Sequence, residues 1–322
     1  MADSTIRVGA IDCGTNSIRL LVADIDPATR SLVDLHRRME IVRLGHGVDR
    51  TGSIAPESME RTLRVTREYA VTCRELGAER VRFVATSASR DASNAAEFIA
   101  GVHTAFQEDF GADVAPEVVS GDEEASLSFA GATGGLAARG VAGPYLVVDL
   151  GGGSTEFVRG TDHVEAARSV DIGCVRLTER HLASDPPTPA QIDAATADVD
   201  AALDEAERSV PFEGVATLVG LAGSITTITA HLLRLPAYSA ERVHLTRSSP
   251  DDMIVASTEL LSMSRAERAA LPYLHPGRVD VIGAGGLVWR RIVERFVERS
   301  GSTEIVTSEH DILDGIALSQ IV

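Results

Sequence analysis

A strand-turn-strand pattern that occurs twice constrains this chain more than any other feature. The first copy reads AIDCGTNSIRLLVADID and the second VVDLGGGSTEFVRGTDH. In each copy an apolar run ends in an aspartate, turns through small or amide residues and resumes as a second apolar run, which is typical of two strands joined by a tight turn. When the two copies are aligned without gaps, Asp12 matches Asp149, Gly14 matches Gly151 and Ser17 matches Ser154.

The elements expected after each copy also follow a common order, which indicates duplication. After the first copy we expect a third strand at 31–45, a helix at 56–76, a strand at 81–88, a helix at 94–110, a short strand at 116–121 and a helix at 122–136. After the second we expect a strand at 164–177, a helix at 188–208, a strand at 215–224 and helices at 225–233 and 281–301. A strand at 303–308 and a helix at 311–322 close the chain. The sequence therefore predicts two duplicated α/β domains, 1–125 with 308–322 and 126–307, and a ligand cleft between them.

Composition excludes several classes of protein. All 30 basic residues are arginine, so a P-loop, a Schiff-base lysine and the protein-kinase signature are all missing. The net charge of −17 argues against DNA or RNA as a partner. The first 100 residues hold 14 arginines and 14 acidic residues. The remainder holds 16 arginines and 33 acidic residues. An anionic ligand would therefore use arginines of the first third, unless this imbalance serves only solubility.

Targeting and redox signals are weak. No apolar run is long enough to span a membrane, and the first residues show no secretory pattern, so we expect a soluble cytoplasmic protein with no membrane partner. The three cysteines, Cys13, Cys73 and Cys174, are far apart in sequence and match no paired metal motif or disulfide framework. We expect them to be small buried thiols.

The two turns have the composition of phosphate-binding loops. Backbone amides of glycine-rich turns can converge on phosphate oxygens, and serine or threonine hydroxyls add donors. An aspartate at the strand end would repel a bound phosphate, by roughly 4 kcal/mol at ~4 Å and an effective dielectric near 20. A divalent cation between them, Mg²⁺ held partly through water, would remove that conflict. The alternative is a hairpin whose aspartate only caps its own turn.

Six segments together resemble the exopolyphosphatase / guanosine pentaphosphate phosphohydrolase family. They are AIDCGTNSIRLLV, FVATSASRDASN, VVSGDEEASLSFAGA, VVDLGGGSTEF, VGLAGSITTI and VIGAGGLV. The resemblance implies the fold shared by actin, sugar kinases and chaperone ATPases. The fold class expected is thus α/β, with two duplicated RNase H-like domains and an interdomain cleft. The chain is similar to the short, two-domain members.

The resemblance also implies roles for individual residues. Those matching the phosphate-binding positions are Asn16, Ser17, Arg19, Arg90, Gly151, Gly152, Gly153, Ser154, Thr155, Gly223 and Ser224, and those matching metal-binding positions are Asp12, Asp149 and Glu156. The catalytic base lies in the segment from Ser120 to Ala125, as Glu124 or Glu123, of which we favour Glu124. Both acids could instead be residues that suit the first turn of a helix. The turn with Gly223 could shape the wall of the cleft or only let a helix and strand pack closely.

The activity implied is Mg²⁺-dependent release of terminal orthophosphate from inorganic polyphosphate, with short chains preferred. The alternatives are hydrolysis of guanosine pentaphosphate at the same site, a kinase or ATPase of the shared fold, and a non-catalytic sensor of polyphosphate or the nucleotide. His46 stands where many relatives are expected to carry an acid. It either adds a donor that alters substrate preference or is a tolerated loop substitution. A homodimer is expected.

Overall fold

The computed structural model describes residues 5–321. These divide into two compact units, one of the described residues up to Gly131 together with those from Ile312 on, and the other Ala132–Asp311. The sequence-based boundaries lay at 125/126 and 307/308. The first of these falls inside helix α5 (Gly121–Thr133), which continues for several residues beyond it. Within 5–321, no helix combines the length and the apolar character needed to cross a membrane.

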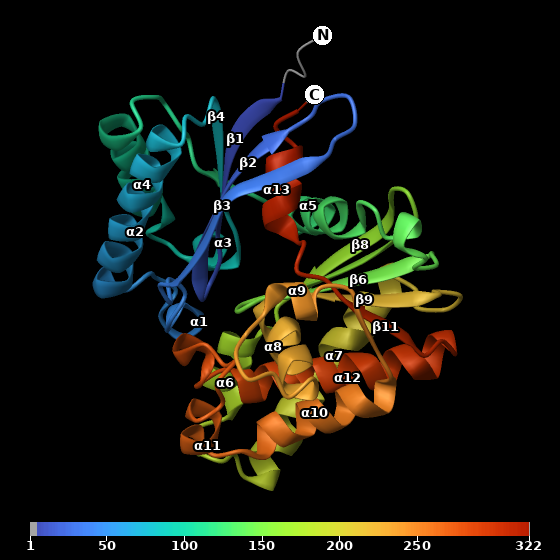
Figure 1. Cartoon of the computed structure of the whole chain (residues 1–322). Coiled ribbons are helices and arrows are strands. Elements are labelled where there is room, and N and C mark those ends of the chain that lie inside the picture. Colours follow the sequence, from blue (N-terminus) through green and yellow to red (C-terminus); the bar gives the residue numbers. More distant parts are fainter. Residues whose placement is uncertain (1–4, 322) are drawn as a thin grey trace. The chain divides into compact units, whose positions relative to one another are not determined.

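The first unit is built on a five-stranded sheet in the order β3-β2-β1-β4-β5 (Figure 1). Its strands are β1 (Ile6–Cys13), β2 (Ser17–Ile25), β3 (Leu32–Ile41), β4 (Arg80–Ala85) and β5 (Glu117–Val118). Strands β1, β2 and β3 are antiparallel neighbours, whereas β4 runs parallel to β1 and β5 parallel to β4. The carboxyl ends of β1, β4 and β5 therefore lie at one edge of the sheet, where ligands of α/β proteins bind.

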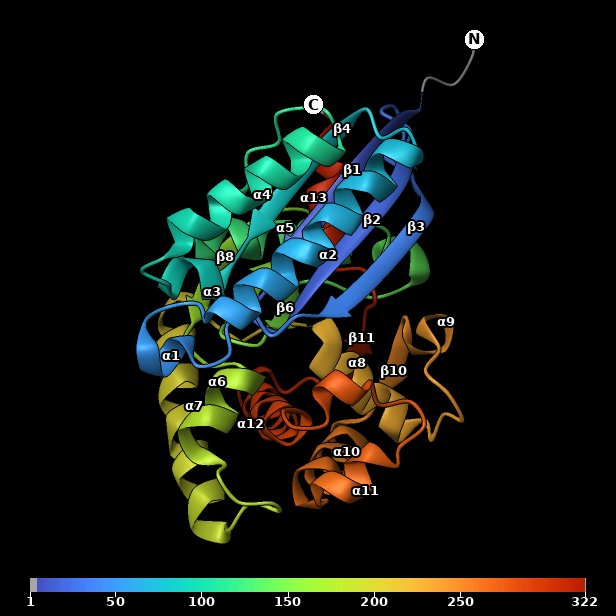
Figure 2. The same ribbon diagram turned by 90° about the vertical axis from the view of Figure 1, so that its left-hand side faces the viewer.

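Two layers of helices cover this sheet. Helices α2 (Pro56–Glu75) and α4 (Ala95–Asp109) lie side by side across one face (Figures 1 and 2), where their apolar residues pack on Ile11, Cys13 and Ile18. Helices α5 and α13 (Ile312–Leu318) supply the core of the other face, on Val8 and Ala10. Two shorter helices are α1 (Val48–Thr51) and α3 (Ser87–Asp91).

The second unit repeats the same strand plan with one added strand. Its order is β10-β11-β9-β6-β7-β8. The strands are β6 (Tyr145–Leu150), β7 (Thr155–Gly160), β8 (Val164–Val170), β9 (Thr217–Leu221), β10 (Thr246–Ser248) and β11 (Glu304–Thr307). The hairpin β6-β7-β8 corresponds to β1-β2-β3, and β9 and β11 run parallel to β6 as β4 and β5 do to β1. The predicted pair of duplicated α/β domains is confirmed.

Helices pack on one face of the second sheet, around Trp289 and Phe157. The helices of this unit are α6 (Cys174–His181), α7 (Pro189–Ser209), α8 (Ala222–Leu232), α9 (Ala240–Val243), α10 (Pro250–Ser262), α11 (Arg265–Ala269) and α12 (Ile282–Ser300). Helix α7 begins with a capping box, in which Thr188 and Gln191 satisfy each other's backbone amides.

Three sequence-based assignments were wrong at their ends. The strand expected at 81–88 ends at Ala85, the one at 164–177 ends at Val170, and the one at 215–224 ends at Leu221. In each case a helix begins within four residues, at Ser87, Cys174 and Ala222 respectively. Each helix has buried residues in its first turn, so the run of buried residues continues from the strand into the helix.

Candidate active site

The turn between β1 and β2 presents backbone amides. Gly14 N–H donates to the Ser17 carbonyl at 2.9 Å, which closes the turn. The carbonyls of Thr15 and Asn16 accept hydrogen bonds from the loop at 42–45. Among residues 5–321, by contrast, no protein acceptor is present for the amides of Thr15 and Asn16. The sequence thus folds here into a turn whose amides are available to an anion.

The loop that holds this turn carries His46. Gly45 N–H donates to the Thr15 carbonyl at 2.9 Å, and a Cβ on Gly45 would lie 2.4 Å from the Thr15 methyl. Glycine is therefore required for this close approach. His46 follows it and is exposed.

The turn between β6 and β7 has the same design. Gly151 N–H donates to the Ser154 carbonyl at 3.1 Å, as Gly14 does to Ser17. The carbonyls of Gly151 and Gly152 accept from the first amides of α6, and Arg176 Nε donates to the Gly153 carbonyl at 2.7 Å. The amides of Gly152, Gly153 and Ser154 find no acceptor within the described part of the chain. The following Thr155 uses its hydroxyl internally, since it donates to the Ile172 carbonyl at 2.7 Å.

The residues opposite the two aspartates differ, although the turns correspond. Asp12 faces Arg19 across the β1–β2 ladder, and Arg19 Nη2 lies 2.7 Å from Asp12 Oδ2. Asp149 faces Glu156 in the same register of β6–β7, and both carboxylates are buried. Like charges directly opposite on one face of a sheet destabilise it. The first unit thus has an arginine opposite its strand-end acid, whereas the second has a glutamate in the corresponding position.

The two candidate bases lie next to each other on α5 but differ in burial and in partner. Glu124 is buried, with its side chain 10% exposed, and its Oε2 accepts from Arg90 Nη1 at 2.6 Å. Glu123 is 46% exposed and pairs with Arg82 instead. Because Val8, Ala10 and Asp12 alternate along β1, Asp12 points to the face on which α5 packs. The geometry thus favours Glu124 as the residue of the pair that belongs to this edge of the sheet.

Arg90 keeps half of its guanidinium free. Its Nη1 donates to Glu124 and, at 2.9 Å, to the Val119 carbonyl. Its Nε and Nη2 have no acceptor among residues 5–321. These two atoms form the edge of the fork that binds phosphate or carboxylate in a bidentate manner.

Two buried serines next to Arg90 were not among the predicted site residues. Ser87 and Ser89 are buried, and within the described residues their hydroxyls have no hydrogen-bond partner. They follow Thr86, whose amide donates to the Cys13 carbonyl beside the first turn. A buried hydroxyl without a hydrogen bond is costly, so these two serines could serve a ligand. The sequence signal that could have identified them is the pair of serines in the motif ATSASR.

An arginine lies against the glycine turn at the start of α8. A Cβ on Gly223 would lie 2.1 Å from Arg278 Nη2, so the guanidinium rests on the glycine. Burial raises the pKa of the Cys174 thiol, and a hydrogen bond with Ser224 offsets part of that rise. Nothing in the local sequence around Arg278 indicates that this cation lies at the start of α8.

The residues of the second hairpin fit a magnesium ion. Within 5–321, no group of three or more His, Cys, Asp or Glu residues has metal-site geometry. Magnesium needs only one or two protein carboxylates, because water and substrate phosphates complete its shell. The buried carboxylates of Asp149 and Glu156 meet that requirement, whereas Asp12 is already bound by Arg19.

The chain is similar to known proteins over nearly its whole length. Exopolyphosphatase 2 of Mycobacterium tuberculosis is 50% identical over 315 residues, which cover 97% of this chain and 98% of the relative. The crystal structure of an exopolyphosphatase-like protein superposes with a TM-score of 0.92 at 43% identity, covering 98% of both chains. The PPX-GPPA enzyme of Aquifex aeolicus superposes with a TM-score of 0.78 at 29% identity, covering 98% of this chain and 99% of that one. Residues 21–320 match the Ppx/GppA phosphatase family, and this chain belongs to that family.

Proposed function

We propose that this protein is an exopolyphosphatase, which releases orthophosphate from the end of an inorganic polyphosphate chain. The observation that carries the proposal is the pair of turns with unpaired amides, at Thr15–Asn16 and at Gly152–Ser154. Such turns bind phosphate oxygens without a lysine, and this chain has none. The similarity to Exopolyphosphatase 2 supports the same substrate.

In the proposed reaction, Glu124 activates the attacking water. The free edge of the Arg90 guanidinium binds the terminal phosphoryl group, which brings that group next to the Glu124 carboxylate. Glu124 accepts a proton as the water oxygen bonds to phosphorus, and the bond from phosphorus to the bridging oxygen breaks. The products are orthophosphate and a polyphosphate shorter by one unit.

Hydrogen-bond donors and a cation would stabilise the negative charge of the substrate. Asp149 and Glu156 would hold Mg²⁺, which supplies positive charge against the phosphate oxygens when bound. The turn amides and the hydroxyls of Ser17 and Ser154 donate to the same class of oxygen. We further propose that the protein works as a homodimer in the cytoplasm. Light scattering of the purified chain tests the first of these two points.

The test is orthophosphate release from polyphosphates of defined length, with guanosine pentaphosphate and ATP assayed beside them in Mg²⁺. We expect turnover of polyphosphate without an acceptor, with the shorter chains preferred. Release from the nucleotide alone would assign the site to guanosine pentaphosphate instead. Binding of polyphosphate without any release would identify a sensor.

A further inference from the structure

A pocket lies between α2 and α4, on the face of the first unit that carries no candidate catalytic residue. Its volume is about 320 Å³, which is at the lower end of the range for small-molecule sites. One end is closed by a double hydrogen bond, in which the Asn94 side chain pairs with the N–H and the carbonyl of Ile54 at 2.8 and 3.0 Å. Next to the pocket the helices approach closely, because a Cβ on Gly101 would lie 2.6 Å from Leu63.

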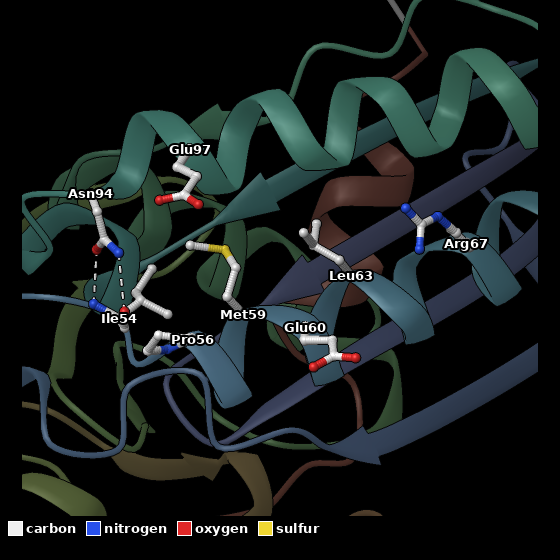
Figure 3. Close-up of a pocket in the computed structure, with 8 residues that line it drawn as sticks. All are labelled: Ile54, Pro56, Met59, Glu60, Leu63, Arg67, Asn94 and Glu97. Carbon is white, nitrogen blue, oxygen red and sulfur yellow. Dashed lines mark hydrogen bonds between the residues drawn. The ribbon is translucent and has the colours of Figure 1, made fainter.

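The lining of this pocket is apolar in the middle and oppositely charged at its ends. Figure 3 shows Met59 and Leu63 between Glu97 on one side and Arg67 on the other. Glu60 also lines the rim but points away from α4 (Figure 3). Met59 is almost fully buried, and a methionine side chain adapts readily to the shape of a ligand.

The two end charges lack protein partners. Neither Glu97 nor Arg67 forms an ion pair or side-chain hydrogen bond with any residue of 5–321. Most other arginines of the first unit donate to a carboxylate or to a backbone carbonyl, for example Arg38 to Glu40 and Glu68 and Arg61 to the Val42 carbonyl. A carboxylate and a guanidinium that flank an apolar surface without meeting each other are complementary to a molecule with the reverse arrangement of charges.

We propose that this pocket binds a zwitterionic small molecule whose ammonium and carboxylate are joined by an aliphatic chain. The ammonium lies at Glu97, the chain covers Met59 and Leu63, and the carboxylate lies at Arg67. Eight helical residues separate Met59 from Arg67, or about 12 Å along the axis. An extended chain of about six to eight carbons covers most of that length.

The test is calorimetric titration of the full chain with ω-amino acids of four, six and eight carbons, beside hexylamine and hexanoate. We expect the six- or eight-carbon zwitterion to bind about tenfold more tightly than the four-carbon one, because only the longer molecules reach both charges. Hexylamine and hexanoate should each bind more weakly than the six-carbon zwitterion, since each satisfies one end only.

Variants that remove one charge show which end of the pocket binds the ammonium and which binds the carboxylate. Glu97→Gln should weaken binding of the zwitterion and of hexylamine about fivefold to tenfold and leave hexanoate unaffected. Arg67→Gln should weaken the zwitterion and hexanoate and leave hexylamine unaffected. The matched controls are Glu108→Gln on α4 and Arg64→Gln on α2, which remove exposed charges that do not line the pocket. The proposal is overturned if no member of the series binds at millimolar concentration, or if neither pocket variant changes the affinity.

Discussion

At the scale of single residues, the buried acids of the two hairpins and of α5 differ in what neutralises them. Asp12 is paired with Arg19, and Glu124 with Arg90. Asp149 and Glu156 face each other, and Glu156 accepts a hydrogen bond from the neutral Ser169 at 2.7 Å. The two hairpins therefore place different residues opposite their strand-end acids, an arginine in the first and a glutamate in the second.

Glu124→Gln should lower kcat for phosphate release by about 10²–10⁴-fold, because the general base is lost. Glutamine keeps the size of the side chain and can still accept from Arg90, so the melting temperature should change little. Glu123→Gln is the matched control, since this side chain is exposed, and its kcat should stay within about twofold of wild type. Equal losses in the two variants would contradict the assignment of Glu124.

Glu156→Gln and Arg19→Gln should shift stability in opposite directions. In metal-free buffer, Glu156→Gln removes a like-charge contact and should stabilise the fold by up to about 1 kcal/mol, whereas Arg19→Gln leaves the buried Asp12 without its partner and should destabilise it by about 1–3 kcal/mol. Urea unfolding with and without Mg²⁺ measures both effects. Stabilisation by Mg²⁺ should disappear in Glu156→Gln and persist in Arg19→Gln; a metal effect retained in the first variant would sink the assigned metal site.

At the scale of elements, a short helix, α6, holds the turn between β6 and β7 in shape. The amides of Cys174, Val175 and Arg176 at the start of α6 donate to the carbonyls of Gly151 and Gly152. A Cβ on Gly173 would lie 2.4 Å from the Gly152 carbonyl carbon and oxygen. The turn between β6 and β7 is thus positioned by α6, which begins only after β7 and β8 in the sequence.

Gly173→Ala should reduce kcat/KM at least tenfold, because the new methyl group displaces the backbone of the second phosphate turn. Gly214→Ala is the control. It lies in the same unit at φ +72°, and no atom lies within 4 Å of the place that its new methyl group would take, so it should cost about 1 kcal/mol of stability and leave kcat/KM unchanged. Steady-state kinetics and urea unfolding of both variants compare the effects, and normal activity in Gly173→Ala would show that the turn tolerates displacement.

A polar network around a buried histidine joins α8 to α10. His231 is fully buried, with Nδ1 2.6 Å from the Tyr273 hydroxyl and Nε2 2.7 Å from Glu259 Oε2. Arg234 also donates to Glu259. Burial lowers the pKa of His231. Burial alone would raise the pKa of Glu259, but the hydrogen bonds from Arg234 and His231 lower it.

Stability should therefore fall on acidification in two stages. Below about pH 6.5, the ordinary pKa of histidine, the unfolded chain binds a proton that folded His231 resists, so stability declines as the pH falls toward the lowered pKa of the folded state. The contribution of Glu259 is lost only at lower pH, below the usual range for glutamate. His231→Gln should flatten the first stage. The exposed His163→Gln should leave it as in wild type, and urea unfolding across this pH range distinguishes the two.

At the scale of the whole molecule, each unit has its own sheet and its own apolar core, and the cysteines lie inside them. Cys13 and Cys73 belong to the core beneath α2 and α4, and Cys174 to that of the second unit. All three thiols are free and buried. Burial raises the pKa of all three, that of Cys73 to about 12.

Native protein should therefore resist thiol reagents. A colorimetric disulfide reagent at neutral pH should label none of the three cysteines within minutes and all three in denaturing urea, because only unfolding exposes them. Reducing agent should leave the melting temperature unchanged. Fast labelling of a native thiol would show that one of the cores opens locally.

Much of this organisation was predictable from local patterns. The repeated aspartate-glycine-serine turn gave the duplication, and the apolar stripe of α2 gave its span almost to the residue. The first residues of the short helices α3 and α6 were assigned to strands, because a short run of buried residues does not distinguish the start of a helix from the end of a strand. Glu124 was favoured over Glu123 from the sequence, but both stayed candidates, since adjacent acids in the first turn of a helix look alike until packing shows which one faces the sheet.

The sequence by itself determined the two-fold repeat, the class of chemistry and the position of both turns, because these depend on contacts between neighbours in the chain. Only the tertiary structure decided which residue lies beside each acid. Arg19 lies beside Asp12, Arg90 beside Glu124 and Glu156 opposite Asp149. It also decided that Arg278 rests on Gly223 and that, among residues 5–321, Glu97 and Arg67 have no protein partner. Strand register and helix packing bring such residues together across distances along the chain that no local pattern encodes.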